Sequence, residues 1–214
     1  MKQICASNRW LLVVLALLLA GCQGFPPAPV NPPPPPLCEE LAQQEESAEN
    51  LPFETIARNP IPTQFWPETE AGLFVITEPQ DLGQITPHVN DEAFANLSNE
   101  EAIANLSMVD FGTSLVVGAF SSMGNGGWQF CITSITQQEN EINIHVHFVD
   151  SPVVPAVTAS YYHLIRLPRA ALPTGDVTFV LALTRHDYVN PTGRQRVLQT
   201  SEEEIVTSVI RTIR

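Results

Sequence analysis

Short apolar runs separated by turn residues fill the second half of this 214-residue chain, and they constrain its fold most. The runs are rich in β-branched and aromatic residues, which favour strands. They are Ser114–Phe120, Gly127–Ile135, Glu141–Val149, Tyr161–Leu167 and Asp176–Leu183. Because short links join most of them, the pattern predicts antiparallel pairing in a sheet or a sandwich.

Two further runs extend the expected sheet towards the N-terminus. Gly72–Thr77 has the same strand-like composition, and Leu51–Arg58 is a candidate for the first strand. A helical segment is expected between these runs and the central strands. Ser98 and Glu101 have the spacing of a capping box, which predicts a helix over Glu100–Leu106.

The C-terminal segment predicts a second helix. Ser201 and Glu204 form another capping box, and Ile205, Val209 and Ile213 share one face at helical spacing. We therefore expect a β-rich α+β fold. It would be an antiparallel sheet or sandwich with a helical segment before the central strands and a C-terminal helix packed on the sheet.

Residues 1–21 have the composition of a secretory signal peptide. Lys2 and Arg9 precede the apolar run Leu11–Ala20, and small residues follow. Cys22 comes next, as in bacterial lipoproteins, in which the lipidated cysteine becomes the first residue. We expect a lipidated (for example palmitoylated) Cys22 that holds the exported chain on the bacterial cell envelope, at the outer membrane, its periplasmic face or the outer cell surface. The alternatives are a plain signal peptide or an N-terminal anchor helix, although the run is shorter than the roughly 20 residues that a spanning helix needs.

A linker is expected over residues 22–50. Residues 23–37 include five consecutive prolines, which favour a stiff, extended polyproline stalk. The alternative role for this stretch is a docking ligand for an aromatic groove. Residues 39–50 are rich in Glu and Gln and offer little to bury, so one exposed helical turn or disorder is expected. The remaining residues, 51–214, are enough for a single β-rich domain.

The charge balance excludes some partners. The chain has 23 acidic and 10 basic residues, a net charge of −13, and it becomes more negative when Lys2 and Arg9 leave with the signal. Such a surface repels phosphate groups, so we expect no nucleic-acid binding and no electrostatic adhesion to anionic lipid. Any membrane attachment is therefore assigned to the lipid at Cys22.

Two cysteines, Cys38 and Cys131, remain after Cys5 is removed and Cys22 is lipidated. Outside the cytoplasm they can form a disulfide. The alternative is that Cys131 is a small core residue on a strand. The sequence leaves both interpretations open.

The stretch Val109–Arg169 carries a resemblance to a known family. It contains Val109-Asp110-Phe111 before a strand, a glycine turn, two strands, and a tyrosine segment that runs into a strand ending at Pro168. This order resembles the C-terminal domain of the PrcB family, subunits of a bacterial surface protease complex, with a PrcB-like core at about residues 109–169. The turn here has Asn and Trp where the family has Thr and Tyr, and Ser160-Tyr161-Tyr162 replaces Tyr-Pro-Tyr.

This resemblance implies a non-catalytic lipoprotein that binds and stabilises a protein partner, a protease in the family's named case. Paired glycines permit close backbone approach, and a following tryptophan offers a large apolar surface. The candidate partner-binding residues are Asn125, Gly126, Gly127, Trp128, Tyr161 and Tyr162. The alternative for the turn is a tight hairpin whose Trp128 covers the core. The two adjacent tyrosines would point to opposite faces of a strand, so one is expected in the core.

A protease inhibitor of the chagasin type is the alternative function. Chagasin-like proteins use a Gly-Gly loop and an Asn-Pro-Thr-Thr-Gly loop. This chain has Gly126-Gly127 and Asn190-Pro191-Thr192-Gly193, in reversed order and with one threonine missing. These residue pairs are also ordinary turn chemistry.

We predict no cofactor, no metal site and no enzymatic activity. His145 and His147 alternate with apolar residues, so both lie on one strand face, where they could share a zinc ion or simply face solvent. His163 and His186 are further ligand candidates only if the fold brings them near. The sequence has neither a Gly-x-Ser-x-Gly nucleophile motif nor a phosphate-binding glycine loop before a helix.

Overall fold

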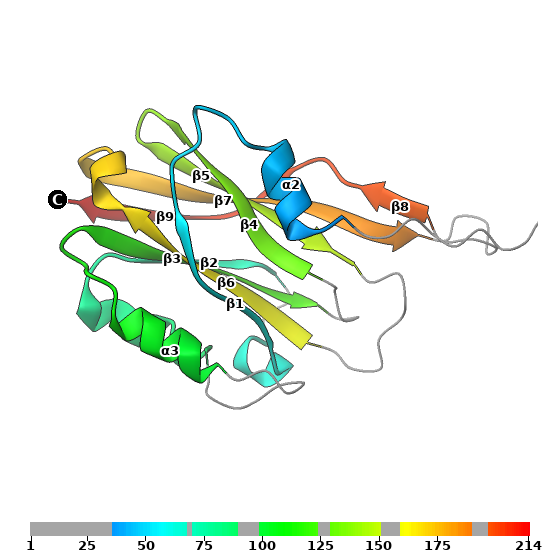
Figure 1. Cartoon of the computed structure of the whole chain (residues 1–214), viewed down its shortest axis with the longest axis horizontal. Helices are drawn as coiled ribbons and strands as arrows, with labels where there is room; N and C mark the ends of the chain where they lie inside the picture. Colours follow the sequence, from blue (N-terminus) through cyan, green and yellow to red (C-terminus); the bar gives the residue numbers. More distant parts are fainter. Residues whose placement is uncertain (1–35, 68–69, 90–98, 124–128, 151–158, 190–196) are drawn as a thin grey trace, which may run out of the picture. The chain divides into compact units, whose positions relative to one another are not determined.

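The computed structural model describes residues 36–67, 70–89, 99–123, 129–150, 159–189 and 197–214 (Figure 1). Within these ranges the strands form two sheets, and the helical elements are short. The helical elements are α2 (Cys38–Gln44), α3 (Glu100–Ser107) and the 3-10 turns η1 (Thr63–Phe65), η2 (Pro79–Gln84) and η3 (Arg169–Ala171). Within the described ranges, no helix is both long and apolar enough to span a membrane.

The first sheet has four strands and is antiparallel throughout. Its order is β1-β6-β3-β2. The strands are β1 (Glu54–Ile61), β2 (Gly72–Ile76), β3 (Ser114–Met123) and β6 (Ala159–Pro168). The β-rich part of the prediction is therefore confirmed.

The second sheet has five strands and is mixed. It contains β4 (Gln129–Gln138), β5 (Glu141–Val149), β7 (Gly175–Val189), β8 (Val197–Thr200) and β9 (Glu204–Ile213). β5 and β7 are parallel, so the expectation of purely antiparallel pairing is wrong here. Between them the chain crosses to the first sheet as β6 and returns, and such a crossover permits parallel neighbours.

The two sheets share one apolar core. Alternate residues of β3, such as Leu115 and Val117, pack against the inward side chains of β5, such as Ile142 and Ile144. The other face of β3 packs beneath α3 and η2, where Val116 and Phe120 are also fully buried. This double burial explains why β3 reads as a continuous apolar run, whereas β5, with one polar face, alternates.

The C-terminal helix predicted from the capping box is wrong, because residues 204–213 form strand β9. β9 pairs antiparallel with the first half of β7. The segment is rich in Ile, Val and Thr, whose branched side chains favour a pleated strand over a helix. The unpaired edge of β7 gives these residues a full row of backbone partners, which outweighs the local capping signal.

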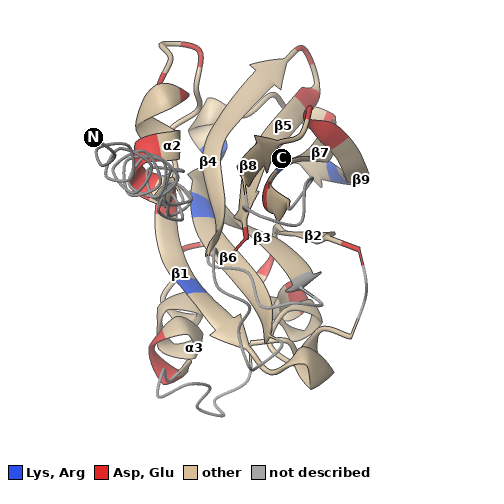
Figure 2. Cartoon of the chain, turned by 90° about the vertical axis from the view of Figure 1, so that its right-hand side faces the viewer, with Lys and Arg blue, Asp and Glu red and all other residues tan. Residues whose placement is uncertain are grey.

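Part of the expected linker lies on the folded body. Helix α2 packs on β4, the backbone N–H of Leu51 donates to the carbonyl of Ile135 (2.8 Å), and Asn50 forms an isolated antiparallel bridge with Thr136. Residues 38–51 therefore follow β4 along its length. Figure 2 shows acidic residues on α2 and α3, with few basic residues on the ribbon.

Candidate functional site

One end of the two sheets gathers the ends of most strands. Met123, the last residue of β3, pairs with Ala159, the first of β6, and Gln129, the first of β4, pairs with Val149, the last of β5. β7 runs parallel to β5 and reaches the same end, where Val189 pairs with the first residue of β8. We call this end the loop end; it lies to the right in Figure 1. Segments 124–128, 151–158 and 190–196 each join strands that end there.

Helix α2 begins at the same loop end. The backbone N–H of Cys38 donates to the side-chain oxygen of Gln129 (2.8 Å), and a disulfide joins Cys38 to Cys131 with a Cα–Cα distance of 6.2 Å. The structure thus forms the disulfide between Cys38 and Cys131, a pairing that the sequence alone left open. The chain that precedes α2 therefore reaches the folded body beside the first residues of β4.

The predicted contact residues divide into two groups. Asn125, Gly126, Gly127 and Trp128 lie outside the described residues, as does Cys22. The two tyrosines lie near the start of β6, on opposite faces.

Tyr162 is fully buried, and its hydroxyl donates to Asn99 Oδ1 (2.7 Å). Burial raises the pKa of Tyr162 to about 12. Tyr161 is half-buried against the core between the sheets, and burial raises its pKa too. Of the two, only Tyr161 has exposed surface to offer a partner.

A polar network that the sequence did not predict lies on the outer face of the five-stranded sheet. At its centre is Glu45, directly after α2. Glu45 Oε2 accepts from the hydroxyls of Thr133 (2.6 Å) and Ser134 (2.8 Å), and Oε1 lies 2.6 Å from His147 Nε2. Burial alone would raise the pKa of Glu45, but these hydrogen bonds outweigh it and lower the pKa to about 2. Glu45 is therefore a carboxylate that fastens α2 to β4 and β5.

The network continues through two buried imidazoles. His147 Nδ1 lies 2.8 Å from His186 Nε2, and the rings stack with centroids 5.1 Å apart. His186 Nδ1 lies 3.0 Å from the hydroxyl of Thr200 on β8. Burial, and then the neighbouring His147, lower the pKa of His186. We call Glu45, Thr133, Ser134, His147, His186 and Thr200 the Glu45 network.

His145 lies on the same strand face as His147 but outside the network. Its ring contacts Thr136 (2.9 Å) and Glu203 (2.6 Å). In the described part of the chain, no group of three or more His, Cys, Asp or Glu side chains is placed to hold a metal ion. His147 and His186 approach each other at hydrogen-bonding distance instead.

His163 is buried between the sheets and joins them. Its Nδ1 accepts the backbone N–H of Ile132 on β4 (2.7 Å), so Nε2 carries the proton and faces the hydroxyl of Thr55 (2.9 Å). Burial, with a smaller contribution from the charge of Arg58, lowers the pKa of His163 to about 3. His163 is therefore a neutral core residue and not a free ligand.

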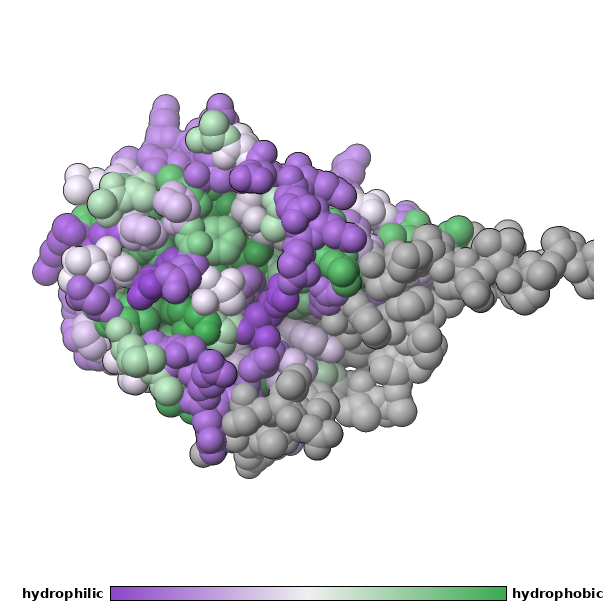
Figure 3. Space-filling model, viewed as in Figure 1, coloured by the Kyte–Doolittle hydropathy of each residue, from purple (hydrophilic) through white to green (hydrophobic). Residues whose placement is uncertain are grey.

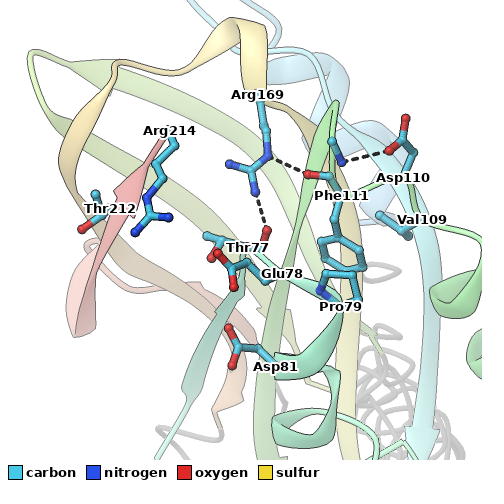
Figure 4. Close-up of a pocket in the computed structure, with 11 residues that line it drawn as sticks. Thr77, Glu78, Pro79, Asp81, Val109, Asp110, Phe111, Arg169, Thr212 and Arg214 are labelled. Carbon is cyan, nitrogen blue, oxygen red and sulfur yellow. Dashed lines mark hydrogen bonds between the residues drawn. The ribbon is translucent and has the colours of Figure 1, made fainter.

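A cavity of 830 Å³ lies at the end opposite the loop end, where β2 ends and β3 begins (Figure 4). Arg169 donates to the carbonyls of Phe111 (2.9 Å) and Thr77, and Asp110 accepts from the Gly112 N–H (2.9 Å). Arg169 thus joins the segments that follow β2 and precede β3 at the cavity wall, whereas Asp110 closes a local turn.

No known protein-family model, curated protein or solved structure matches this chain. The PrcB-like and chagasin-like interpretations accordingly remain predictions.

Proposed function

We propose that this chain is a non-catalytic, lipid-anchored protein of the bacterial cell envelope that binds and stabilises a protein partner through its loop end. The observation that carries the proposal is the convergence of strand ends described above. Binding proteins built from paired sheets commonly use the segments at one end, because a rigid scaffold can then present several variable segments together.

The candidate residues support this choice of surface. Trp128 immediately precedes Gln129, the first residue of β4, and Tyr161 lies at the start of β6. The half-buried ring of Tyr161 combines apolar area with a polar hydroxyl, a combination that is enriched at protein interfaces. Exposed Leu37 and Val197 lie beside the same strand ends.

The position of α2 supports anchorage beside the binding surface. The disulfide holds the N-terminal chain at the loop end, so a lipid at Cys22 would be separated from that end only by residues 23–37. A partner held at the same membrane would then lie within reach. The disulfide is also compatible with a location outside the cytoplasm.

The test compares three forms of the lipidated protein extracted from membranes in mild detergent: the wild type, Trp128→Ala and Gln138→Ala. Gln138 is exposed at the far end of β4 and is the matched control. A specific partner should be recovered with the wild type and Gln138→Ala but much less with Trp128→Ala, at an unchanged melting temperature. Equal recovery by all three forms would refute the loop end as the binding surface. A large drop in melting temperature for Trp128→Ala would instead indicate that Trp128 covers the core.

A protease inhibitor of the chagasin type is the second candidate. It is favoured by one observation: the strands that flank Gly126-Gly127 and Asn190-Pro191-Thr192-Gly193 end at the same loop end. An inhibitor of this type uses both loops, and strands that end together would present both loops from one end of the domain. The purified domain should then inhibit a papain-like protease at micromolar concentration, and the absence of inhibition would remove this candidate.

A further inference from the structure

Two buried imidazoles share a single hydrogen-bonded contact at the base of the β7–β8 hairpin. His147 and His186 are both 6% exposed, and their facing nitrogens are 2.8 Å apart. At this distance one nitrogen must donate and the other must accept. The contact therefore needs one proton between the rings.

The protonation of the other His147 nitrogen, Nε2, is set by its partner Glu45. Glu45 is ionised at neutral pH, so it can only accept, and His147 Nε2 must carry a proton. The pair can then be neutral, with His186 donating to His147, or carry one positive charge. A second positive charge would place two N–H groups against each other across 2.8 Å, which the contact cannot accommodate.

Among the residues that the structure describes, few groups around the pair could stabilise the second charge. Glu45 faces it from α2, while β4 contributes only the hydroxyls of Thr133 and Ser134, and β8 that of Thr200. Arg185 and Asp187 adjoin His186 along β7 but alternate to the other face.

Two more charged groups lie close by. Asp150 follows β5 and donates its backbone N–H to the carbonyl of His186 (2.9 Å). Glu203 is engaged with His145 (2.6 Å). The second positive charge must therefore be accommodated by moving a ring.

The part of the fold that depends on His186 is the β7–β8 hairpin. Pairing between β5 and β7 ends at His186, so beyond this residue β7 is paired only with β8. β8 has four residues, and its last residue, Thr200, is the one that His186 contacts (3.0 Å). A short edge strand with few buried side chains has low local stability, so the loss of one side-chain link matters.

We propose that the His147–His186 pair is a pH-sensitive latch: acid that places a second positive charge on the pair breaks the link to Thr200 and frees strand β8 from the end of β7 at the loop end. Its consequence for partner binding rests on the proposed function, because the hairpin belongs to the proposed binding surface. The latch itself is a property of the fold and can be measured without a partner.

The test is hydrogen exchange of the β8 amides in the intact, disulfide-bonded protein, corrected for intrinsic exchange, at about pH 7.5 and about pH 4.5. Protection of β8 in the wild type should fall by about tenfold at the lower pH, the order of magnitude expected from the loss of one side-chain hydrogen bond. His147→Gln should abolish this fall, because His186 can then take up a proton on Nδ1 and keep its contact with Thr200, as donor instead of acceptor. His88→Gln, a histidine outside the network, should retain the fall.

Thr200→Val provides a variant at an exposed position that should not disturb folding. It should show low β8 protection at both pH values. Equal protection of wild-type β8 at the two pH values would overturn the latch, and so would an unchanged fall in His147→Gln. Recovery of the partner by the wild type, Trp128→Ala and Gln138→Ala does not depend on these exchange results. The latch proposal and the binding-surface proposal can therefore be refuted separately.

Discussion

The neutral, buried His163 predicts a specific loss of stability in acid. In the folded state its Nδ1 accepts the Ile132 N–H, and it stays unprotonated down to about pH 3 because its pKa is about 3. In the unfolded chain it takes up a proton at the ordinary value of 6.5. Between these values the unfolded state binds more protons, so the free energy of unfolding must fall as the pH falls from about 6.5 towards 3 and stay constant above that window.

The magnitude follows from the two pKa values. Each pKa unit corresponds to about 1.4 kcal/mol, so His163 should contribute a loss on the order of 3 kcal/mol at about pH 4 and roughly 5 kcal/mol once the pH is below 3. Carboxylates and other histidines titrate in the same range, so the effect must be isolated by comparison with a variant. His163→Asn keeps an acceptor near the position of Nδ1 but cannot be protonated in this range.

The assay is urea unfolding of the signal-less domain, followed by tryptophan fluorescence, at several pH values between about 4 and 7.5. The wild type and His163→Asn should converge as the pH falls, because only the wild type loses the contribution of His163. The difference between their free energies of unfolding should change by about 3 kcal/mol over this range. A difference that stays constant with pH would refute the assignment of His163 as a neutral link between the sheets.

Three further predictions concern α2 and the first sheet. Replacement of Cys38 by Ser should lower the free energy of unfolding by about 4–5 kcal/mol on the chain-entropy estimate, because the disulfide closes a loop with a sequence separation of 93. In this variant a reducing agent should have no further effect on the melting temperature. Glu45→Gln should cost about 1–2 kcal/mol at pH 7. Because the pKa of Glu45 is lowered from 4.5 to about 2, that cost should disappear as the pH falls through this window, which urea titrations would show. Gly72→Ala should destabilise by about 1–3 kcal/mol in thermal melts, because a Cβ there would lie 2.3 Å from the ring of Trp66.

The sequence predicted the central strands well because their burial leaves a local signal. The expected run Glu141–Val149 coincides with β5, and Ser114–Phe120 lies within β3. The C-terminal segment was misassigned because residues four apart, such as Ile205, Val209 and Ile213, share a face in a helix and also in a regular strand, so their spacing alone does not distinguish the two. In β9 a register shift opposite Leu181 and Ala182 separates Ile205, which is exposed, from Val209, which packs on the core.

The parallel pairing of β5 and β7 leaves no comparable signal. Which strand neighbours which depends on contacts distant in sequence, and the crossover through β6 is visible only in three dimensions. The Glu45 network was missed for a similar reason. Glu45 lies in a Glu- and Gln-rich stretch that resembles a flexible linker, and its position against β4 depends on contacts distant in sequence, among them the disulfide of Cys38 with Cys131.

A single irregularity in β4 underlies both the His163 link between the sheets and the contact of Glu45 with the outer face of β4. The register shifts between Ile132 and Ser134, so Thr133 is an extra residue opposite β5. The bulge leaves the N–H of Ile132 available to His163 on the inner side, and it turns two consecutive hydroxyls, Thr133 and Ser134, to the same oxygen of Glu45 on the outer side. In a regular strand consecutive side chains point to opposite faces, so Glu45 could not accept from both. The same bulge thus links the two sheets and fixes α2 on the sheet, and deletion of Thr133 should weaken both connections at once.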